Sequence, residues 1–381
     1  MAKLESYITV GRDRLRCGYT TGTCAAAASL GAARRLVYGA WDAAVSIRTP
    51  AGIAVTAELE ELSCGGDWAM CAVRKDGGDD PDVTDGALVF SRVRLTDTGR
   101  VEIDGGEGVG RVTRPGLDQP VGSAAINSVP RAMIREALEP FCEPGRGFLA
   151  VISVPGGDKI ARSTFNPRLG ITGGISILGT SGIVRPMSEA ALVESVRLEI
   201  RAVRASGADS LLLTPGNYGS GFARDTLRLS SRAQALCSNY IGEAIDCAAA
   251  EGFASVLLVG HLGKLIKVAG GAMNTHSRVC DGRRETFCAH AALCGAGPAV
   301  IRELFAAPTS DAAADILRRC GLLGNVMASI TGALEENLRR RAGGMRIEAV
   351  FFTNRLGVLG ETAGARELMD IHRLSETEGE Q

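Results

Sequence analysis

Short turns of glycine and small polar residues follow four strands that the sequence predicts in the C-terminal part of the chain. These turns lie at residues 155–157, 214–219, 260–264 and 353–355. In an open parallel sheet, ligands bind at the carboxyl ends of the strands. One such turn is an ordinary connection, but four together predict a binding crevice. The residues that we expect to bind a nucleotide-like cofactor there are Gly156, Gly157, Gly216, Asn217 and Gly260. No G-x-G-x-x-G fingerprint joins a strand to a helix in this region, so the binding loop would be a variant.

A second candidate lies at the start of an alanine-rich helix that is predicted over residues 23–37. Thr20, Thr21 and Thr23 bring three hydroxyl groups to the helix N-terminus, where free amide groups and the helix dipole attract anions. An anionic substrate or a phosphate fits this end. A well-capped helix on a tight interface explains the same residues equally well. A small-molecule kinase would also use such a loop, although the lysine of a conventional P-loop is missing.

Two histidines and several arginines lie in polar or glycine-rich stretches. His276 is surrounded in sequence by polar residues, and His261 directly follows a predicted strand. Either could exchange a proton in catalysis, but a single histidine is more often a structural hydrogen-bonding residue. Arginine suits the bidentate capture of carboxylates. Such arginines occur in the stretches 105–116 and 164–170, and a solvated surface loop is the alternative interpretation of the first stretch.

The pattern of hydrophobic residues predicts two domains, at residues 1–147 and 148–381. The first mixes short strands with few helices, and its helices are expected at 23–37 and 130–138. The second alternates apolar strands with longer helices. Its strands are expected at 148–154, 210–213, 254–259 and 346–352, and its helices include 188–205, 231–251 and 325–341. Such alternation predicts a parallel, doubly wound α/β sheet.

The composition excludes several classes of protein. The chain has 381 residues, of which 45% are hydrophobic, so it can fill large cores. Because its net charge is −1, we do not expect a broad face that binds nucleic acid. No apolar run has the length of a membrane span and the first ten residues lack a signal-peptide pattern, so we expect a cytoplasmic protein. The 11 cysteines form no C-x-x-C pair, which favours reduced thiols and no protein-bound metal.

Long strings of this chain resemble the CbiD family. In order they are GYTTGTCAAAA at residues 18–28, KDGGDDPDVT at 75–84, GVGRVTRPGL at 108–117, INSVPRAMI at 126–134, FNPRLGITGGISILGTSGIVRPMS at 165–188, LTPGNYG at 213–219 and VGHLGKLIKVAGGAMNTHSR at 259–278. The resemblance spans roughly residues 15–360. Such unusual strings in a fixed order are very specific. The departures, at Ala124, Ala125 and Ser128, put no motif in doubt.

The resemblance implies a fold and a reaction. The implied fold is an S5-domain-2-like N-terminal α+β domain followed by a Rossmann-like C-terminal domain. The family transfers a methyl group from S-adenosylmethionine to ring carbon C1 of cobalt-precorrin-5B, which gives cobalt-precorrin-6A in the anaerobic route to cobalamin. The cobalt arrives with the tetrapyrrole substrate. Transient contact with neighbouring enzymes of the pathway is a further expectation.

The anionic macrocycle, with its acetate and propionate arms, suggests roles for the basic and hydroxyl side chains. The expected substrate-binding residues are Thr20, Thr21, Thr23, Arg111, Arg114, Arg168, Lys264 and Arg278. The candidate catalytic residues are His276 and His261. Methyl transfer from a sulfonium is an in-line displacement that depends chiefly on positioning and needs no covalent nucleophile. The alternatives to this enzyme are the kinase and a noncatalytic carrier that binds the macrocycle without the methyl donor.

Overall fold

The computed structural model describes residues 3–10 and 12–373. The chain forms two compact units, Met1–Glu189 and Ala190–Gln381, and each unit combines helices with strands. The units are described separately below. No helix in the described part of the chain is long and apolar enough to span a membrane.

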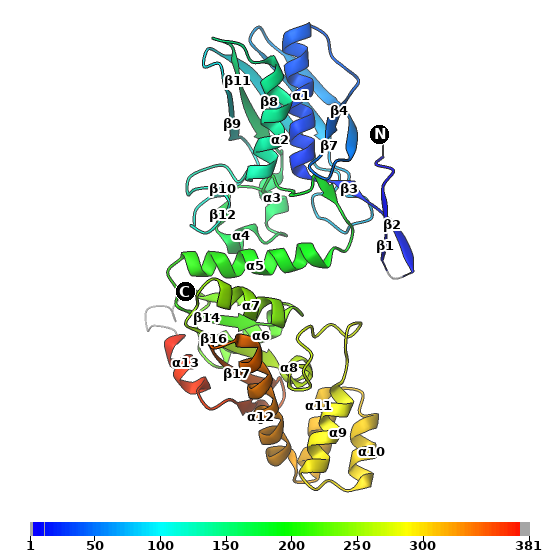
Figure 1. The fold of residues 1–381 in the computed structure, drawn as a ribbon, viewed down its shortest axis with the longest axis vertical. Helices are drawn as coiled ribbons and strands as arrows, with labels where there is room; N and C mark the ends of the chain where they lie inside the picture. The colour runs from blue at the N-terminus through cyan, green and yellow to red at the C-terminus, as the bar shows by residue number, and fades with distance from the viewer. Residues whose placement is uncertain (1–2, 11, 374–381) are drawn as a thin grey trace. The chain divides into compact units, whose positions relative to one another are not determined.

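The first unit contains most of the short strands (Figure 1). Its elements are β1 (Tyr7–Val10), β2 (Asp13–Arg16), β3 (Gly18–Tyr19), α1 (Thr21–Tyr38), β4 (Ala44–Arg48), β5 (Ala54–Glu58), β6 (Glu60–Cys64), β7 (Trp68–Arg74), β8 (Leu88–Thr96), β9 (Val101–Gly105), β10 (Arg111–Val112), α2 (Ser128–Leu138), the short 3₁₀ helix η1 (Glu139–Phe141), β11 (Gly147–Ser153), α3 (Gly157–Ala161), α4 (Asn166–Leu169), β12 (Ile171–Thr172) and β13 (Ile183–Val184).

The main sheet of this unit has the strand order β6-β7-β8-β11-β9. Along β8, Val89, Ser91 and Val93 are buried, whereas Arg92 and Arg94 are exposed. This alternation shows that one face of the sheet is covered and the other is not. The cover consists of α1 and α2, which pack against each other, with α1 lying over β7 and β8 (Figure 1). The two helices predicted in this region are therefore confirmed.

The predicted boundary at residues 147 and 148 is wrong. The strand expected at 148–154 is β11, which pairs antiparallel with β8 and parallel with β9 inside the first unit. The units divide between Glu189 and Ala190 instead. A run of apolar residues identifies a strand that is buried, but it carries no information about which sheet the strand joins.

The second unit is built on a largely parallel sheet. Its elements are α5 (Glu189–Ala205), β14 (Ser210–Thr214), α6 (Asn217–Asp225), β15 (Gln234–Leu236), α7 (Ile241–Ala250), β16 (Ser255–His261), α8 (Leu262–Ala269), α9 (Arg283–Leu293), α10 (Pro298–Ala306), α11 (Ser310–Arg319), α12 (Leu323–Ala342), β17 (Arg346–Thr353), β18 (Gly357–Glu361) and α13 (Ala365–Ile371). The strand order is β15-β14-β16-β17-β18, and every neighbouring pair is parallel except β17 with β18.

Helices cover both faces of this sheet. Every residue of β14 is buried, and so is every residue of β16 except the last. Leu211 and Leu213 of β14 belong to the large core that includes residues of α5, α7, α8 and α12. Leu212, between them, belongs to the smaller core on the opposite face, with residues of α6 and α13. Leu257 of β16 joins Leu212 there. The predicted parallel sheet with helices on both faces is thus confirmed, and β18 adds an unpredicted antiparallel edge.

One predicted helix is half as long as expected. The sequence favours a helix over residues 231–251, with a capping box at Ser231 and Gln234, but the helix found there is α7, Ile241–Ala250. Gln234–Leu236 forms β15 instead, because its backbone pairs with Leu212 to Thr214 of β14. Hydrogen bonds to a neighbouring strand thus override a local capping pattern.

A buried histidine makes the stability of the second unit depend on pH. His372 is buried, and its Nε2 lies 2.9 Å from the hydroxyl of Ser210, which in turn accepts a hydrogen bond from Ser255. Burial lowers the pKa of His372 from 6.5 to about 4. The unfolded chain therefore binds a proton at a higher pH than the folded chain does, so folding is favoured at neutral pH and loses stability as the pH falls from 6.5 to about 4.

We expect His372→Gln to remove this pH dependence. In the natural protein the contribution amounts to about 3 kcal/mol between the two ends of that window. The measurement is urea unfolding of both proteins at a series of pH values, followed by circular dichroism. Trp41 and Trp68 both lie in the first unit, so tryptophan fluorescence serves as the control that reports on the other half of the chain. An identical pH slope in the two proteins would contradict the assignment.

Candidate functional site

The carboxyl edge of the parallel sheet contains a switch in the direction of the chain. From β14 the chain passes through α6 to β15 on one side, and it then crosses through α7 to β16 on the other side. Ligands bind preferentially at such a switch point. Gly216 and Asn217 follow β14, and Gly260 lies near the end of the neighbouring β16. The structure therefore brings these three predicted residues to one edge.

The two glycines at this edge are needed for different reasons. Gly216 has φ 105° and ψ −175°, a conformation that is essentially restricted to glycine, and a Cβ atom there would meet no atom within 4 Å. A Cβ on Gly260, in contrast, would lie 3.0 Å from Leu265 Cγ and 3.2 Å from Pro215 Cγ. Packing of α8 accounts for Gly260, whereas the open space at Gly216 leaves the backbone accessible to a ligand.

His261 caps α8 with its side chain. Its Nδ1 accepts a hydrogen bond from the Gly263 amide at 3.1 Å, and its Nε2 lies 3.7 Å from Asp311 Oδ2. The ring also packs edge-on against Phe352. With Nδ1 acting as an acceptor, a neutral ring carries its proton on Nε2, facing the carboxylate. Both nitrogens are thus directed at protein groups, and the catalytic role of His261 stays a prediction.

Lys264 connects the loops that follow two other strands. Its Nζ donates to the carbonyl oxygen of Pro215 at 2.9 Å and to that of Ser238 at 3.0 Å. These carbonyls belong to the turns after β14 and β15. Ser238 has φ 50°, a left-handed conformation that is uncommon for a residue other than glycine. The predicted substrate-binding lysine therefore donates its hydrogen bonds to the backbone of the crevice.

The segment with His276 and Arg278 is anchored next to the same edge. Thr275 donates its amide to the carbonyl of Asn239, which directly follows Ser238. His276 is exposed, and its Nδ1 accepts from the amide of Arg278 at 3.1 Å within a turn. The buried Lys267 holds this turn by donating to Thr275 O at 3.0 Å. The catalytic role of His276 and the substrate-binding role of Arg278 stay predictions.

Ser310 is a residue that the sequence patterns did not single out. It is buried, and its hydroxyl has no hydrogen-bond partner among the described residues. A Cβ built on Gly263 would lie 3.4 Å from Ser310 Oγ and 3.3 Å from His261 Nδ1, so this unpaired hydroxyl lies beside the N-terminus of α8. Thr309 and Ser310 form a recognisable helix start, but nothing in the sequence places that start beside Gly263.

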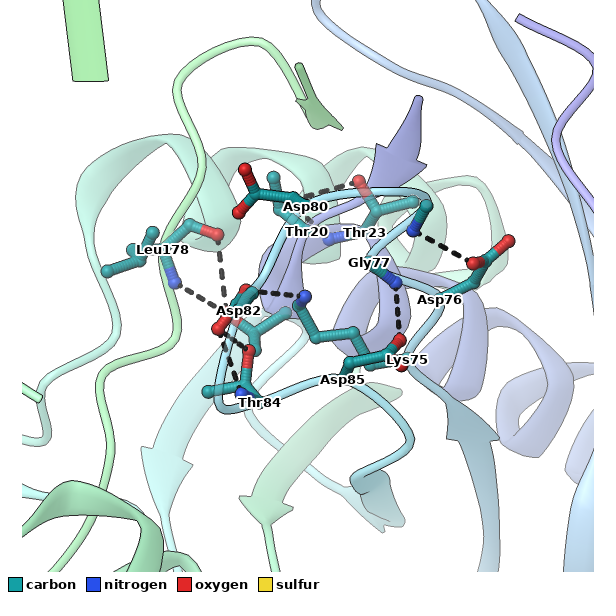
Figure 2. A network of polar contacts seen from close by, with 12 residues as sticks. Thr20, Thr23, Lys75, Asp76, Gly77, Asp80, Asp82, Thr84, Asp85 and Leu178 are labelled. Atoms are coloured by element: carbon teal, nitrogen blue, oxygen red, sulfur yellow. Dashed lines mark hydrogen bonds and ion pairs between the residues drawn. The ribbon is translucent and has the colours of Figure 1, made fainter. Parts of the chain in front are cut away.

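The three predicted threonines of the first unit are buried at the start of α1, where Figure 2 shows their surroundings. Thr20 Oγ1 caps the helix by accepting from the Thr23 amide at 3.3 Å. Thr21 Oγ1 accepts from the Leu178 amide at 3.0 Å, and Thr23 Oγ1 donates to Gly182 O at 2.6 Å. The hydroxyl groups are therefore engaged in contacts within the protein.

The backbone amides at this helix start are engaged as well. The amide of Gly22 donates to Leu178 O, and that of Cys24 donates to Thr20 O, both at 3.1 Å. A phosphate-binding loop needs such amides to point at the ligand. The geometry is that of a capped helix on a tight interface, which was the alternative interpretation. Substrate binding by the three threonines stays a prediction, and their contacts explain these residues without a ligand.

The loop of residues 75–85 packs against the same helix start (Figure 2). Lys75 Nζ forms an ion pair with Asp82 at 2.7 Å, and the Lys75 side chain is only 2% exposed. Burial opposes ionisation of Asp82, but the Lys75 ammonium and the Thr84 hydrogen bonds outweigh it, so the pKa of Asp82 is lowered. Asp85 accepts from the Gly77 amide, and Asp80 accepts from the Met187 amide. These acidic side chains hold the loop in place.

The predicted arginines of the first unit differ in whether their side chains are paired with a carboxylate. Arg111 is paired with Asp104 at 2.8 Å, and both side chains are about half exposed. The Arg114 side chain lies against Gly170, since a Cβ there would be 2.5 Å from Arg114 Cγ. Arg168 lies two residues before Gly170 in α4, and Arg114 and Arg168 are both exposed. The structure therefore brings Arg114 and Arg168 to one region of the surface.

Gly156 and Gly157 do not lie at the edge of the parallel sheet. They follow β11 in the first unit, whereas Gly216, Asn217 and Gly260 belong to the second. A Cβ on Gly157 would lie 2.2 Å from Gly108 O, so close packing of two backbone segments explains this glycine. The assumption that all five residues line one sheet edge is wrong, because β11 belongs to a different sheet.

Removal of the Asp82 carboxylate should destabilise the first unit. In Asp82→Asn the buried Lys75 ammonium would lose its ion-pair partner, which we expect to cost about 3 kcal/mol of unfolding free energy. Asp80→Asn is the matched control, because its more exposed carboxylate accepts a single amide hydrogen bond and should cost about 1 kcal/mol or less. Urea unfolding followed by tryptophan fluorescence measures both. Equal effects would argue against a special role for the buried pair.

Family models and curated relatives that match this chain point to the same family, and together they cover almost the whole chain. The family model described as CbiD matches residues 8–186, and the model described as CbiD, C-terminal domain, matches residues 274–363. A protein of Ruminiclostridium cellulolyticum named cobalt-precorrin-5B C(1)-methyltransferase is 47% identical over 92% of each chain. A protein of the same name from Alkaliphilus metalliredigens is 41% identical over 97% of this chain and 98% of its own. Another, from Salmonella typhimurium, is 45% identical over 81% of each chain.

One solved structure is also similar. It is that of a cobalamin biosynthesis protein (cbiD) from Archaeoglobus fulgidus, with 29% sequence identity, coverage of 74% of this chain and 87% of that chain, and a TM-score of 0.39. The matches of both family models and the full-length relatives together show that this chain belongs to the CbiD family.

Proposed function

We propose that this chain is a cobalt-precorrin-5B C(1)-methyltransferase of cobalamin biosynthesis. In this proposal it transfers a methyl group from S-adenosylmethionine to ring carbon C1 of cobalt-precorrin-5B and gives cobalt-precorrin-6A. The observation that carries the proposal is the 47% identity, over 92% of both chains, with a relative of that name. We expect the enzyme to act in the cytoplasm and to pass its product to neighbouring enzymes of the pathway.

The finer fold assignments belong to this proposal. We infer a Rossmann-like second unit, because four parallel strands in the order β15-β14-β16-β17 have helices on both faces. We infer an S5-domain-2-like first unit from its sheet of five strands with α1 and α2 on one face. The first inference has a functional consequence, since a sheet of this kind holds its ligand at the switch point.

We propose that the methyl donor binds at the switch point between β14 and β16. The free space at Gly216 supports this location, because a ligand can approach the backbone there. Asn217 opens α6, whose N-terminal amides favour the carboxylate of the donor. Gly156 and Gly157 lack this support, because they follow a strand of the other sheet.

For the macrocycle we propose contacts from exposed arginines. Arg114 and Arg168 share one region of the first unit, and Arg278 is exposed in the second. Their guanidinium groups can take up carboxylate arms in bidentate fashion. Arg111 is a weaker candidate, because Asp104 already occupies part of its hydrogen-bonding capacity.

Methyl transfer depends mainly on the alignment of the donor methyl group with the acceptor carbon. When bound, S-adenosylmethionine supplies an electrophilic methyl group on a sulfonium. The residues of the protein have to hold the acceptor carbon in line with that group, and such positioning supplies about 7–11 kcal/mol of the barrier. His276 and His261 are both candidates for proton transfer. The His276 ring is exposed and only its Nδ1 has a protein partner among the described residues, whereas both ring nitrogens of His261 face protein groups.

Calorimetric titration with S-adenosylmethionine, S-adenosylhomocysteine and ATP tests the proposal. We expect the first two to bind and ATP not to bind. Binding of ATP alone would favour the kinase, although the amides of Gly22, Thr23 and Cys24 at the start of α1 already donate within the protein. If neither methyl-donor ligand binds, the titration is repeated with the cobalt macrocycle bound. Continued failure would identify a carrier and reject the enzyme.

A pair of glycine substitutions tests the location of the donor. Gly216 and Gly207 both have positive φ, at 105° and 92°, and a Cβ on either would meet no atom within 4 Å. Gly216→Leu and Gly207→Leu both place a side chain on a glycine with positive φ, at a cost in backbone strain of about 1–3 kcal/mol. We expect only Gly216→Leu to weaken the binding of S-adenosylhomocysteine, by about 10-fold or more, because only this side chain enters the crevice. Equal affinities of the two variants would contradict the location.

A further inference from the structure

Lys264 occupies a position that is unfavourable for a positive charge. It is the third residue of α8, so it lies in the first turn, where the helix dipole is positive and no acidic residue compensates. Burial lowers the pKa of Lys264, and the neighbouring ammonium of Lys267 acts in the same direction. No carboxylate among the described residues forms an ion pair with it; its partners are two backbone carbonyls.

The two buried lysines, Lys75 and Lys267, have different partners from the partly buried Lys264. Lys75 is paired with Asp82 at 2.7 Å, and Lys267 lies 3.6 Å from Asp281 in addition to its hydrogen bonds. The nearby thiol of Cys237 does not replace a carboxylate for Lys264, because burial raises the pKa of Cys237 to about 12 and keeps the thiol neutral. Lys264 therefore retains an excess of positive charge at the crevice. Departures from local rules of this kind are expected at functional sites.

The two carbonyl contacts give this charge a geometric role. Pro215 O belongs to the turn that leads to Gly216, and Ser238 O belongs to a residue held at φ 50°. A single ammonium thus fixes the turns after β14 and β15 from a helix that follows β16. Two of its three N–H groups are used in these bonds. The third can serve a ligand, and the charge favours an anionic group.

We propose that Lys264 is a positioning residue for the methyl donor: its ammonium holds the turns after β14 and β15 in the arrangement that receives the donor, and its charge favours the donor's carboxylate. This role rests on the proposed function and differs from the capture of substrate arms that the sequence suggested. The first consequence concerns geometry, because loss of the ammonium frees both turns. The second concerns charge, because a neutral amine at this position attracts the carboxylate less.

The experiment measures the affinity of S-adenosylhomocysteine for three variants by calorimetry. Lys264→Met keeps the length of the side chain and removes its donors and charge; we expect affinity to fall about 10-fold or more. Lys264→Arg keeps donors and charge and should stay within about 3-fold of the natural protein. Lys267→Met is the matched control one turn along α8. It removes a buried lysine that binds the 274–281 segment, so it should lower the unfolding temperature and reduce the affinity much less than Lys264→Met does.

The pH dependence of binding separates this role from a general effect on folding. As the pH rises toward the usual range of lysine, Lys264 loses its proton early because its pKa is lowered. Affinity in the natural protein should therefore fall with rising pH, whereas Lys264→Arg should show a flat profile, since arginine stays charged. The groups that face Lys264 are Cys237 and Lys267, and the Lys267→Met profile shows whether Lys267 contributes. If Lys264→Met does not fold, this comparison decides the question alone.

The possible outcomes distinguish the two proposals. If the natural protein binds S-adenosylhomocysteine and Lys264→Met binds it equally well, the role of Lys264 is rejected and the methyltransferase stands. Parallel pH profiles of the natural protein and Lys264→Arg would also reject it. If the natural protein binds neither S-adenosylmethionine nor S-adenosylhomocysteine, with or without the macrocycle, the proposed donor is rejected and the role of Lys264 falls with it.

Discussion

A parallel sheet with helices on both faces can expose polar backbone and side chains only at its two ends, and this constraint organises the second unit. The interiors of β14 and β16 are fully apolar and buried. At the amino end, Ser210 and Ser255 form a closed hydrogen-bonded chain with His372. At the carboxyl end the polar groups are not all satisfied within the protein: Gly216 faces open space and the Ser310 hydroxyl is unpaired. The difference between the two ends is what makes the carboxyl edge the candidate site.

Several glycines of the first unit allow close contact between backbone segments. A Cβ on Gly18 would lie 2.2 Å from Asp76 O, and one on Gly78 would lie 2.3 Å from Arg16 O. These contacts bring the 75–85 loop against the start of α1 (Figure 2). The glycines at 108 and 157 make a similar contact elsewhere in the unit. Glycine-rich strings that look like ligand loops in the sequence are therefore, at these positions, the means by which irregular segments pack without side chains.

The buried Lys75 and Lys267 differ in their partners from the partly buried Lys264, for which we propose a role in the site. Lys75 and Lys267 have carboxylates nearby, and each holds a loop of its own unit. Lys264 has backbone carbonyls alone and lies at the positive end of a helix. A buried charge without a counterion is costly unless something else pairs with it. In the proposed function, the carboxylate of the methyl donor is that partner.

The sequence by itself determined the family, the central strands of the parallel sheet and several of the long helices, because ordered strings and hydrophobic periodicity are local properties. It also identified Gly216, Asn217 and His261 as neighbours of one sheet edge, since each follows an apolar strand. Only the tertiary structure decided that β11 joins the first unit's sheet and that Gln234 lies in a strand, because strand pairing depends on partners far away in the chain. The same reason explains why Ser310 was missed and why the threonines of α1 were assigned to a ligand. The hydrogen-bonding partners of these threonines lie up to 159 residues away in the chain, and the Ser310 hydroxyl has no partner among the described residues. No local sequence pattern records such contacts.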